Sequence, residues 1–234
     1  MYIQVCIDVK PSSPGIDGMK PAATRADAPE PSAREKILAT ASDLFYREGI
    51  RAVGVDTIVE KSGVAKTSLY RWFPSKDALV AAFLDDQNRR FWQWWDKVAA
   101  RHPDAPREQF RALLSGMLKR LAHPQYRGCP FMNTTAEFAE ARHPGRAVAR
   151  SNRQEMRRRL RDLVARMGAR DPDRLSDQLS LLISGAYTSA QMLGESGPQL
   201  ELTSAAEALI DAQLAADRSN AAEPARSPAP ANGA

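Results

Sequence analysis

Residues 55–79 read VDTIVEKSGVAKTSLYRWFPSKDAL, and this stretch decides the fold of the chain. Its apolar residues recur at helical spacing in two short segments, 55–61 and 65–73, and Gly63 lies in the turn between them. Glycine adopts a left-handed turn conformation without steric cost, so we expect a helix-turn-helix at this point. The small core that fixes the angle between its helices is expected from Val55, Ile58, Val59, Val64 and Leu69.

The start of the second short helix carries side chains suited to nucleic acid. In a helix-turn-helix the N-terminal residues of the second helix reach base edges in the major groove. Short hydroxyls and an amine can meet bases or phosphates there, and the helix N-terminus itself favours phosphate. Any one of these residues could be an ordinary polar residue on the surface, whereas their combined spacing favours DNA binding. The predicted DNA-binding residues are Lys66, Thr67, Ser68, Tyr70, Arg71 and Lys76.

This part of the sequence resembles the TetR family of bacterial regulators. The resemblance covers residues 34–84, with a first helix REKILATASDLFYREG, then the helix-turn-helix, then SLYRWFPSKDAL. The family's turn glycine, valine, polar residues, Leu-Tyr, two aromatics and Lys-led helix occur here from Gly63 to Lys76. The resemblance implies that the helix start at Lys66, Thr67 and Ser68 faces bases, and that Tyr70 and Lys76 contact phosphates.

Two positions depart from the family's pattern. Gly54 stands where the family usually has a Thr or Ser that caps the first helix of the motif, so a hydroxyl able to contact phosphate is missing. Val59 replaces the usual small Ala. Gly54 leaves one alternative open, a helical ligand-binding dimer whose motif has lost its DNA function.

The rest of the chain predicts an all-α protein of about nine helices. We expect an N-terminal three-helix helix-turn-helix DNA-binding domain at 32–80 and a C-terminal helical ligand-binding and dimerisation domain at 81–216. The Pro-rich ends, 1–31 and 217–234, are predicted to be disordered arms, and Met19 is an alternative start. Beyond the motif, helices are predicted at 76–100, 105–122, 130–141, 145–168, 172–195 and 201–216.

Composition narrows the class of protein. Hydrophobic residues make up 43% of the 234 residues, and no apolar run approaches the roughly 18 residues of a membrane-spanning helix. The net charge of +5 permits an anionic partner without demanding one. Two cysteines are too few for a disulfide scaffold, which indicates a reducing, cytoplasmic location.

The motifs of catalysis are missing from the sequence. It contains no glycine-rich phosphate loop, no nucleophile elbow and no Cys-x-x-Cys pair. The three histidines are far apart in sequence, which gives little support for a metal site. We therefore expect no enzyme, no metal and no cofactor.

The partners of the protein are predicted from the family resemblance alone. These are a small-molecule effector, a second copy of the chain, and double-stranded DNA with a palindromic operator that two recognition helices read one turn apart, about 34–36 Å. Effector binding is expected to release a repressor from DNA. A constitutive DNA-binding protein without an effector is a second alternative.

Aromatic residues mark candidate walls of an effector pocket. The run FWQWW at 91–95 places rings on more than one side of a helix, so some can pack in the core while others line a cavity or an interface. Core packing explains each ring individually, whereas aromatic lining suits a flat or apolar effector. The candidate pocket residues are Phe91, Trp92, Trp95, Phe110, Met117, Phe131, Phe138 and Tyr187.

One apolar stripe in the predicted helix 172–195 is the candidate dimer surface. Small residues within it would permit close helix approach, although an ordinary buried helix produces the same stripe. The candidate dimer residues are Leu175, Leu179, Leu182, Ile183, Ala186, Ala190 and Leu193.

Two further features leave alternatives open. Cys129, predicted as the cap of the helix that begins at Pro130, is either a reactive thiol sensor or a buried apolar residue. Arginines at three- and four-residue steps from Arg146 to Arg161 form either a solvated helix face or, less simply, an attractive surface for an acidic effector or partner.

Overall fold

The protein folds into a bundle of α-helices, as seen in a computed structural model that describes residues 30–220. Within that range there are nine α-helices and no strand, which confirms the all-α prediction. The arms predicted at 1–31 and 217–234 lie mostly outside the described residues. The helices are α1 (Ala33–Glu48), α2 (Val55–Ser62), α3 (Lys66–Trp72), α4 (Lys76–Ala99), α5 (Pro106–Leu121), α6 (Pro130–Glu137), α7 (Pro144–Arg166), α8 (Pro172–Leu193) and α9 (Leu202–Asn220).

The helix ends follow from local sequence. Proline tolerates the first helical position because its missing N–H would have no partner there, and α5, α6, α7 and α8 all begin with one. Ser32 and Glu35 form a capping box at α1, in which the Glu35 carboxylate accepts the Ser32 N–H at 2.8 Å. Gly49 ends α1 at a φ of 92°.

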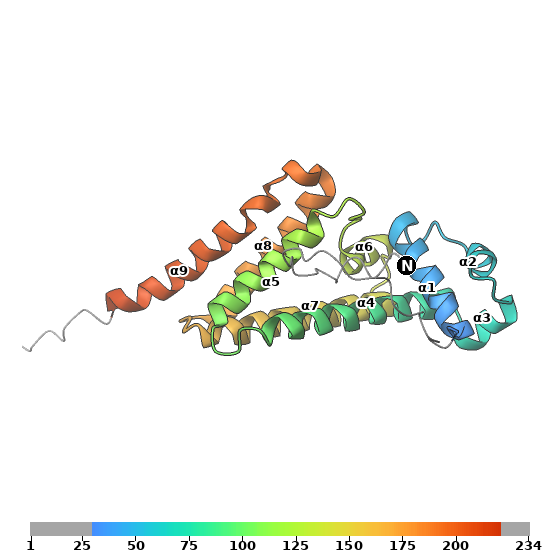
Figure 1. Ribbon diagram of the computed structural model, residues 1–234, viewed down its shortest axis with the longest axis horizontal. Helices are drawn as coiled ribbons and strands as arrows, with labels where there is room; N and C mark the ends of the chain where they lie inside the picture. Colours follow the sequence, from blue (N-terminus) through green and yellow to red (C-terminus); the bar gives the residue numbers. More distant parts are fainter. Residues whose placement is uncertain (1–29, 221–234) are drawn as a thin grey trace, which may run out of the picture.

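Helices α1, α2 and α3 form one end of the molecule, and α9 reaches toward the opposite end (Figure 1). The 24-residue α4 connects the two, because its rise of about 1.5 Å per residue gives it a length of about 36 Å. It packs along α7, the other long helix of the second domain.

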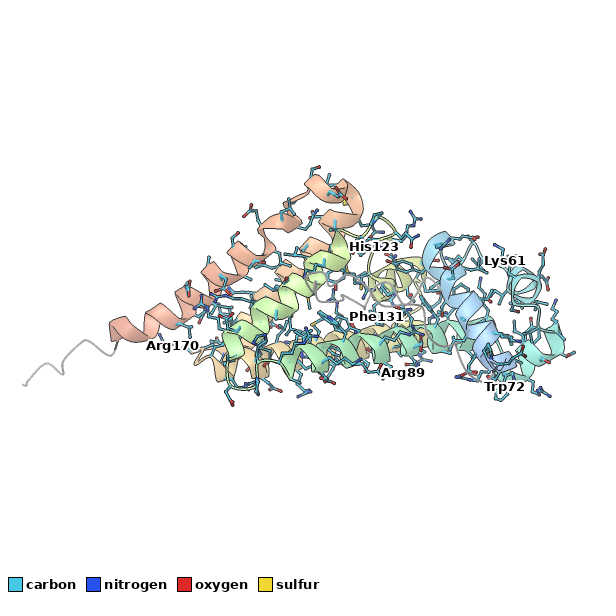
Figure 2. The ribbon with its side chains drawn as sticks, in the orientation of Figure 1. Lys61, Trp72, Arg89, His123, Phe131 and Arg170 are labelled. Carbon is cyan, nitrogen blue, oxygen red and sulfur yellow. The ribbon has the colours of Figure 1, made fainter. Side chains whose placement is uncertain are left out.

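Two clusters of buried side chains form the core. The N-terminal cluster joins α1, α2 and α3 to the first half of α4, around fully buried residues such as Ile37, Ile58, Leu69 and Leu79. The second cluster joins the second half of α4 to α5, α7, α8 and α9. Phe131 of α6 belongs to the N-terminal cluster although it lies in the second domain (Figure 2).

Helix α6 and the loop before it connect the two parts. The Tyr46 hydroxyl of α1 donates to the Gly128 carbonyl at 3.3 Å and accepts the Arg127 N–H at 3.0 Å. At the other end of α6, the Glu137 carboxylate accepts the backbone N–H of Arg51 at 2.8 Å. The three-helix end is therefore held to α6 by hydrogen bonds as well as by apolar packing.

The structure departs from the predicted boundaries at three places, one of which is α9, since this helix continues to Asn220 where the prediction ended it at 216 and began a disordered arm. Helix α6 ends at Glu137 and not at 141, because Arg146 of α7 donates to the carbonyls of Phe138 and Ala139 and so replaces further helical hydrogen bonds. Two 3₁₀ turns, η2 (Gly194–Ser196) and η3 (Pro198–Glu201), join α8 to α9, where the sequence predicted a longer helix. In the part of the chain that the structure describes, no helix is long and apolar enough to span a membrane.

Candidate nucleic-acid interface and effector cavity

The helix-turn-helix forms as its sequence predicts. Gly63 ends α2 in the left-handed conformation, with a φ of 67°, which turns the chain into α3. Leu69 and Phe73, exposed by 0% and 3%, fix the inner face of α3 in the N-terminal core. The opposite face of this seven-residue helix is left to solvent.

The six predicted DNA-binding residues lie together at this end of the molecule. Lys66, Thr67, Tyr70 and Arg71 are exposed, and Ser68 is half-buried. Lys76, the first residue of α4, is also half-buried. The exposed Trp72 beside them, labelled in Figure 2, was missed by sequence reasoning. Its signal in the sequence was a large aromatic side chain in the short helix that carries the predicted DNA-binding residues, since a large apolar side chain left in solvent is uncommon.

Lys66 has an ion-pair partner that the sequence did not suggest. Its ammonium lies 2.7 Å from a carboxylate oxygen of Asp56, on the first turn of α2. The hydrogen bond to Asp56 raises the pKa of Lys66 above its usual value. Since Asp56 is exposed on the same surface, it places a negative charge beside the predicted base-reading residues.

Lys76 lies where the two parts of the molecule meet. Partial burial lowers the pKa of its ammonium, and the nearby carboxylates of Glu137 and Asp77 act in the opposite direction. Ser75 caps α4 by accepting the Ala78 N–H at 3.0 Å, which fixes the helix start that carries Lys76. The ammonium is thus close to both α4 and the end of α6.

Both helices of the motif begin without a side-chain cap. Gly54 precedes α2 and Ala65 precedes α3, and neither has a side chain that can accept the free N–H groups of the first turn. The N-terminal N–H groups of both α2 and α3 therefore lack a side-chain acceptor at the N-cap position.

A small cavity lies among α4, α5, α6, α7 and α8. Of the eight predicted pocket residues, Phe91, Phe131 and Tyr187 line it. Trp95, Phe110 and Met117 are buried in the second core cluster and do not line it. Trp92 packs beneath the guanidinium of Arg159, at 4.5 Å, and Phe138 stacks on His143 with ring centroids 3.8 Å apart.

Polar residues complete the cavity, and sequence reasoning did not assign them to it. They are Arg120, Arg153, Gln87 and Asn152, of which only Arg153 belongs to the arginine-rich face that the sequence singled out. Cys129 also lines the cavity as a half-buried free thiol, and it makes no side-chain hydrogen bond as the cap of α6.

The arginine-rich face of α7 is mostly neutralised. Arg157 pairs with Asp177, and Arg161 donates to Asp173 at 3.0 Å, both on α8. Arg146 donates to carbonyls at the end of α6. Arg153 differs, because it donates to the Ser184 hydroxyl at 2.8 Å and to the Met132 sulfur at 3.4 Å, both of them neutral.

Most of the predicted dimer stripe faces the core of its own chain. Leu175, Leu179, Ile183, Ala186 and Ala190 are at most 5% exposed, so they are not available to a second copy. Leu182 is half-buried, and Leu193 is exposed.

Apolar surface remains on the other side of α8. Leu181 and Met192 are about three-quarters exposed, and Leu200 in the following turn is 63% exposed. A groove of about 430 Å³ lies between this face of α8 and the start of α9. Among the described residues, no cluster of His, Cys, Asp and Glu could hold a metal ion.

Two family models match the chain. Residues 37–83 match the model described as bacterial regulatory proteins, tetR family, and residues 106–209 match the tetracyclin repressor-like C-terminal domain. Among curated proteins, the chain is similar to the uncharacterized HTH-type transcriptional regulator YxaF of Bacillus subtilis, 55% identical over 42 residues, 18% of this chain and 22% of that protein. It is also similar to EthR of Mycolicibacterium smegmatis, 28% identical over 92 residues, 39% of this chain. The chain thus spans only 22% and 42% of the lengths of these two relatives.

Solved structures match over most of the chain. A TetR-family transcriptional regulator from Streptomyces coelicolor is 28% identical, with a TM-score of 0.66, over 80% of this chain and 95% of that one. A putative tetR transcriptional regulator from Streptomyces avermitilis is 31% identical, with a TM-score of 0.66, over 78% of this chain and 98% of that one.

Proposed function

The chain belongs to the TetR family of bacterial regulatory proteins, and we propose that it is a sequence-specific DNA-binding transcription regulator. The observation that carries the proposal is the solvent-facing side of α3, where Lys66, Thr67, Tyr70 and Arg71 are exposed beside Lys76. Amine, hydroxyl and guanidinium donors on a short helix at the tip of the molecule suit the edges of bases and phosphates in a major groove.

A homodimer is the second part of the proposal. The exposed Leu181 lines the 430 Å³ groove between α8 and α9, and Met192 and Leu200 add exposed apolar surface at the end of α8 and in the following turn. A second copy would bury this apolar surface. Two copies would present two α3 helices to a palindromic operator. A charge in this face, Leu181→Glu, is expected to give monomers in sedimentation analysis and to lower operator affinity, whereas Gln93→Glu, which adds the same charge at an exposed position of α4, serves as a control. A dimer that survives Leu181→Glu would place the interface elsewhere.

Effector control is the third part. The cavity among α4 to α8 reaches α6. The loop before α6 is hydrogen-bonded to Tyr46 of α1, and Glu137 of α6 accepts the Arg51 N–H of the α1–α2 loop. We propose that an effector in this cavity favours a conformation of the dimer with low operator affinity, which requires different effector affinities for the two conformations. A constitutive DNA-binding protein is the competing candidate, and unchanged operator affinity at saturating effector would support it.

DNA binding is tested first with the purified full chain and the DNA upstream of its own gene, against random duplex, over a salt series. Sequence-selective binding supports the regulator. Equal, weak binding to any duplex, with no operator found by genome-wide selection, would contradict it and favour a ligand-binding dimer without DNA function.

A further inference from the structure

Phe138, at the end of α6, belongs to a series of side chains that joins the second domain to the three-helix end. Its ring lies nearly parallel to the imidazole of His143, with 15° between the planes and 3.8 Å between the ring centroids. The guanidinium of Arg51 lies over the Phe138 ring, 5.9 Å from its centroid. Nε2 of His143 lies 3.4 Å from a carboxylate oxygen of Asp77. We call these four side chains, Arg51, Phe138, His143 and Asp77, the junction stack.

Both ends of the junction stack belong to the part of the molecule that carries α3. Arg51 lies in the loop between α1 and α2, and Asp77 lies in the first turn of α4. Phe138 and His143 come from the second domain, where they follow α6 and precede α7. The second domain therefore holds the three-helix end at two elements, one before and one after the helix-turn-helix in the chain.

His143 is fixed by contacts of its own. Its Nδ1 accepts the Gly145 N–H at 3.1 Å and so caps α7. Helices also approach one another closely at this point, since a β-carbon on Gly145 would lie 3.1 Å from side-chain atoms of both Thr134 of α6 and Val80 of α4. The imidazole is therefore attached to a place where α4, α6 and α7 meet with little free space.

Arg51 and Phe138 are fixed as well. The backbone N–H of Arg51 donates to the Glu137 carboxylate at 2.8 Å, and its guanidinium donates to the Glu137 carbonyl at 3.1 Å. The carbonyl of Phe138 accepts a guanidinium N–H of Arg146 from α7 at 2.8 Å. Both inner and outer members of the junction stack thus have a defined position.

The junction stack supplies a directional contact between the two parts. Phe131 also joins them, but it does so by apolar packing in the N-terminal core, and the hydrophobic effect has no preferred direction. Stacked rings and hydrogen bonds favour particular distances and angles. A long helix such as α4 curves gently, so continuity of α4 alone leaves the angle of the three-helix end open.

This angle matters for DNA once two copies associate. The position of α3 against its own second domain then sets the distance and the rotation between the two α3 helices. Inserting one base pair between two half-sites moves one of them by about 3.4 Å along the DNA and turns it by about 35°. A dimer rejects the altered spacing only if its three-helix ends cannot follow this movement.

We propose that the junction stack fixes α3 against the second domain, so that Phe138 and His143 are positioning residues that determine which half-site spacing the dimer accepts. The proposal rests on the proposed function in taking the chain as a dimeric DNA-binding regulator. Neither residue has to contact DNA in this role. Loss of the junction stack therefore widens the range of accepted spacings and leaves the reading of a single half-site intact.

The variants remove a ring and keep its other contacts. Phe138→Leu keeps an apolar side chain in place of the ring, whereas His143→Asn keeps a side chain suited to capping α7. Phe138→Tyr retains the ring and is expected to behave as wild type. Trp92→Leu is the matched control, because Trp92 is also half-buried beside a guanidinium, that of Arg159 at 4.5 Å, but lies about 24 Å along α4 from its first residue.

The measurement is the affinity of the full chain for an operator found by genome-wide selection. Fluorescence anisotropy compares this operator with duplexes whose centre is one base pair longer or shorter, and with a duplex that holds one half-site. Wild type, Phe138→Tyr and Trp92→Leu are expected to prefer the native spacing about tenfold or more, which is about the cost of one mismatched contact.

Phe138→Leu and His143→Asn are each expected to reduce the preference for the native spacing about threefold or more, since an aromatic pair contributes about that factor. Their half-site affinities should stay within about twofold of wild type, because distant sites act independently. Circular dichroism identifies a variant that fails to fold, in which case the other one decides. An unchanged spacing preference in the folded variants would refute the role, and so would a half-site affinity that falls as much as operator affinity.

The junction stack and the regulator function can fail separately. Wild type that selects no DNA sequence would reject the regulator, and the positioning role with it. Wild type that selects an operator, together with stack variants that keep its spacing preference, would leave the regulator intact and reject only the junction stack. Wild type that selects an operator but accepts all three spacings equally would also reject the junction stack alone.

Discussion

Removing the charge of Lys76 tests whether the start of α4 contacts a phosphate. We choose Lys76→Met because the side chain is half-buried, and methionine keeps most of its apolar stem in place. Burial already lowers the pKa of Lys76, so losing the ammonium is not expected to unfold the protein. Lys97→Met is the control, since Lys97 is exposed on the last turn of the same helix, about 30 Å away.

The size of the effect follows from counterion release. Each phosphate contact that is lost makes the slope of log affinity against log salt shallower by about 0.9, and a dimer loses two, or about 1.8. Between about 50 and 200 mM salt, a fourfold change, this slope difference corresponds to about a twelvefold change in relative affinity. Lys76→Met should therefore bind much more weakly than wild type at low salt, and the deficit should shrink about twelvefold at high salt.

The assay is fluorescence anisotropy with a labelled operator and a labelled random duplex. The variant is expected to lose affinity for both duplexes alike, because a phosphate contact carries no sequence information. A salt slope equal to that of wild type, or of Lys97→Met, would refute the phosphate contact. Loss confined to the operator would instead make Lys76 a base-reading residue.

Three further predictions concern individual contacts. Asp56→Asn releases Lys66 from its 2.7 Å ion pair and removes a negative charge from the interface, so operator affinity in the same assay should rise a few-fold; a fall would show that the pair positions Lys66 for DNA. Ala65→Ser supplies the missing cap of α3 and should raise the free energy of unfolding by about 1 kcal/mol, seen as a melting temperature about 2–4 °C higher; an unchanged value would mean that the new hydroxyl makes no hydrogen bond to α3. The hydrogen bond from Arg158 lowers the pKa of Glu155 to about 2, so the stability it adds is present above about pH 4.5 and is lost as pH falls toward 2. Urea titrations should accordingly show the cost of Glu155→Gln shrinking from pH 5 to pH 3, and a cost independent of pH would contradict the ion pair.

The helix-turn-helix could be predicted because its signals are local. A glycine at the turn, proline after the second helix and a serine cap act on neighbouring backbone, and Gly63, Pro74 and Ser75 occupy those roles. The proline starts of α5 to α8 are local in the same way. The end of α6 was misplaced because Arg146, from the next helix, stops it through a contact that local patterns do not contain.

The cavity and the dimer face were harder to predict because both depend on which way a helix turns in the assembled fold. Trp95 and Phe91 are four residues apart on α4, yet only Phe91 reaches the cavity. Arg153 looked like one more solvated arginine, since its neutral surroundings come from α6 and α8. The stripe through Leu179 was read as a dimer face because an apolar stripe looks the same whether it covers its own core or a second copy.

Phe131 lines the cavity proposed for the effector and is also part of the core that supports α3. If a ligand enters by displacing this ring, the free energy of displacement contributes to both ligand binding and operator binding. Thermodynamic linkage then makes the effect of the ligand on operator affinity equal to the effect of the operator on ligand affinity. The factor by which a saturating effector weakens operator binding must then equal the factor by which operator DNA weakens binding of that effector. In such a regulator, operator DNA lowers the affinity for the effector although the DNA does not contact the effector.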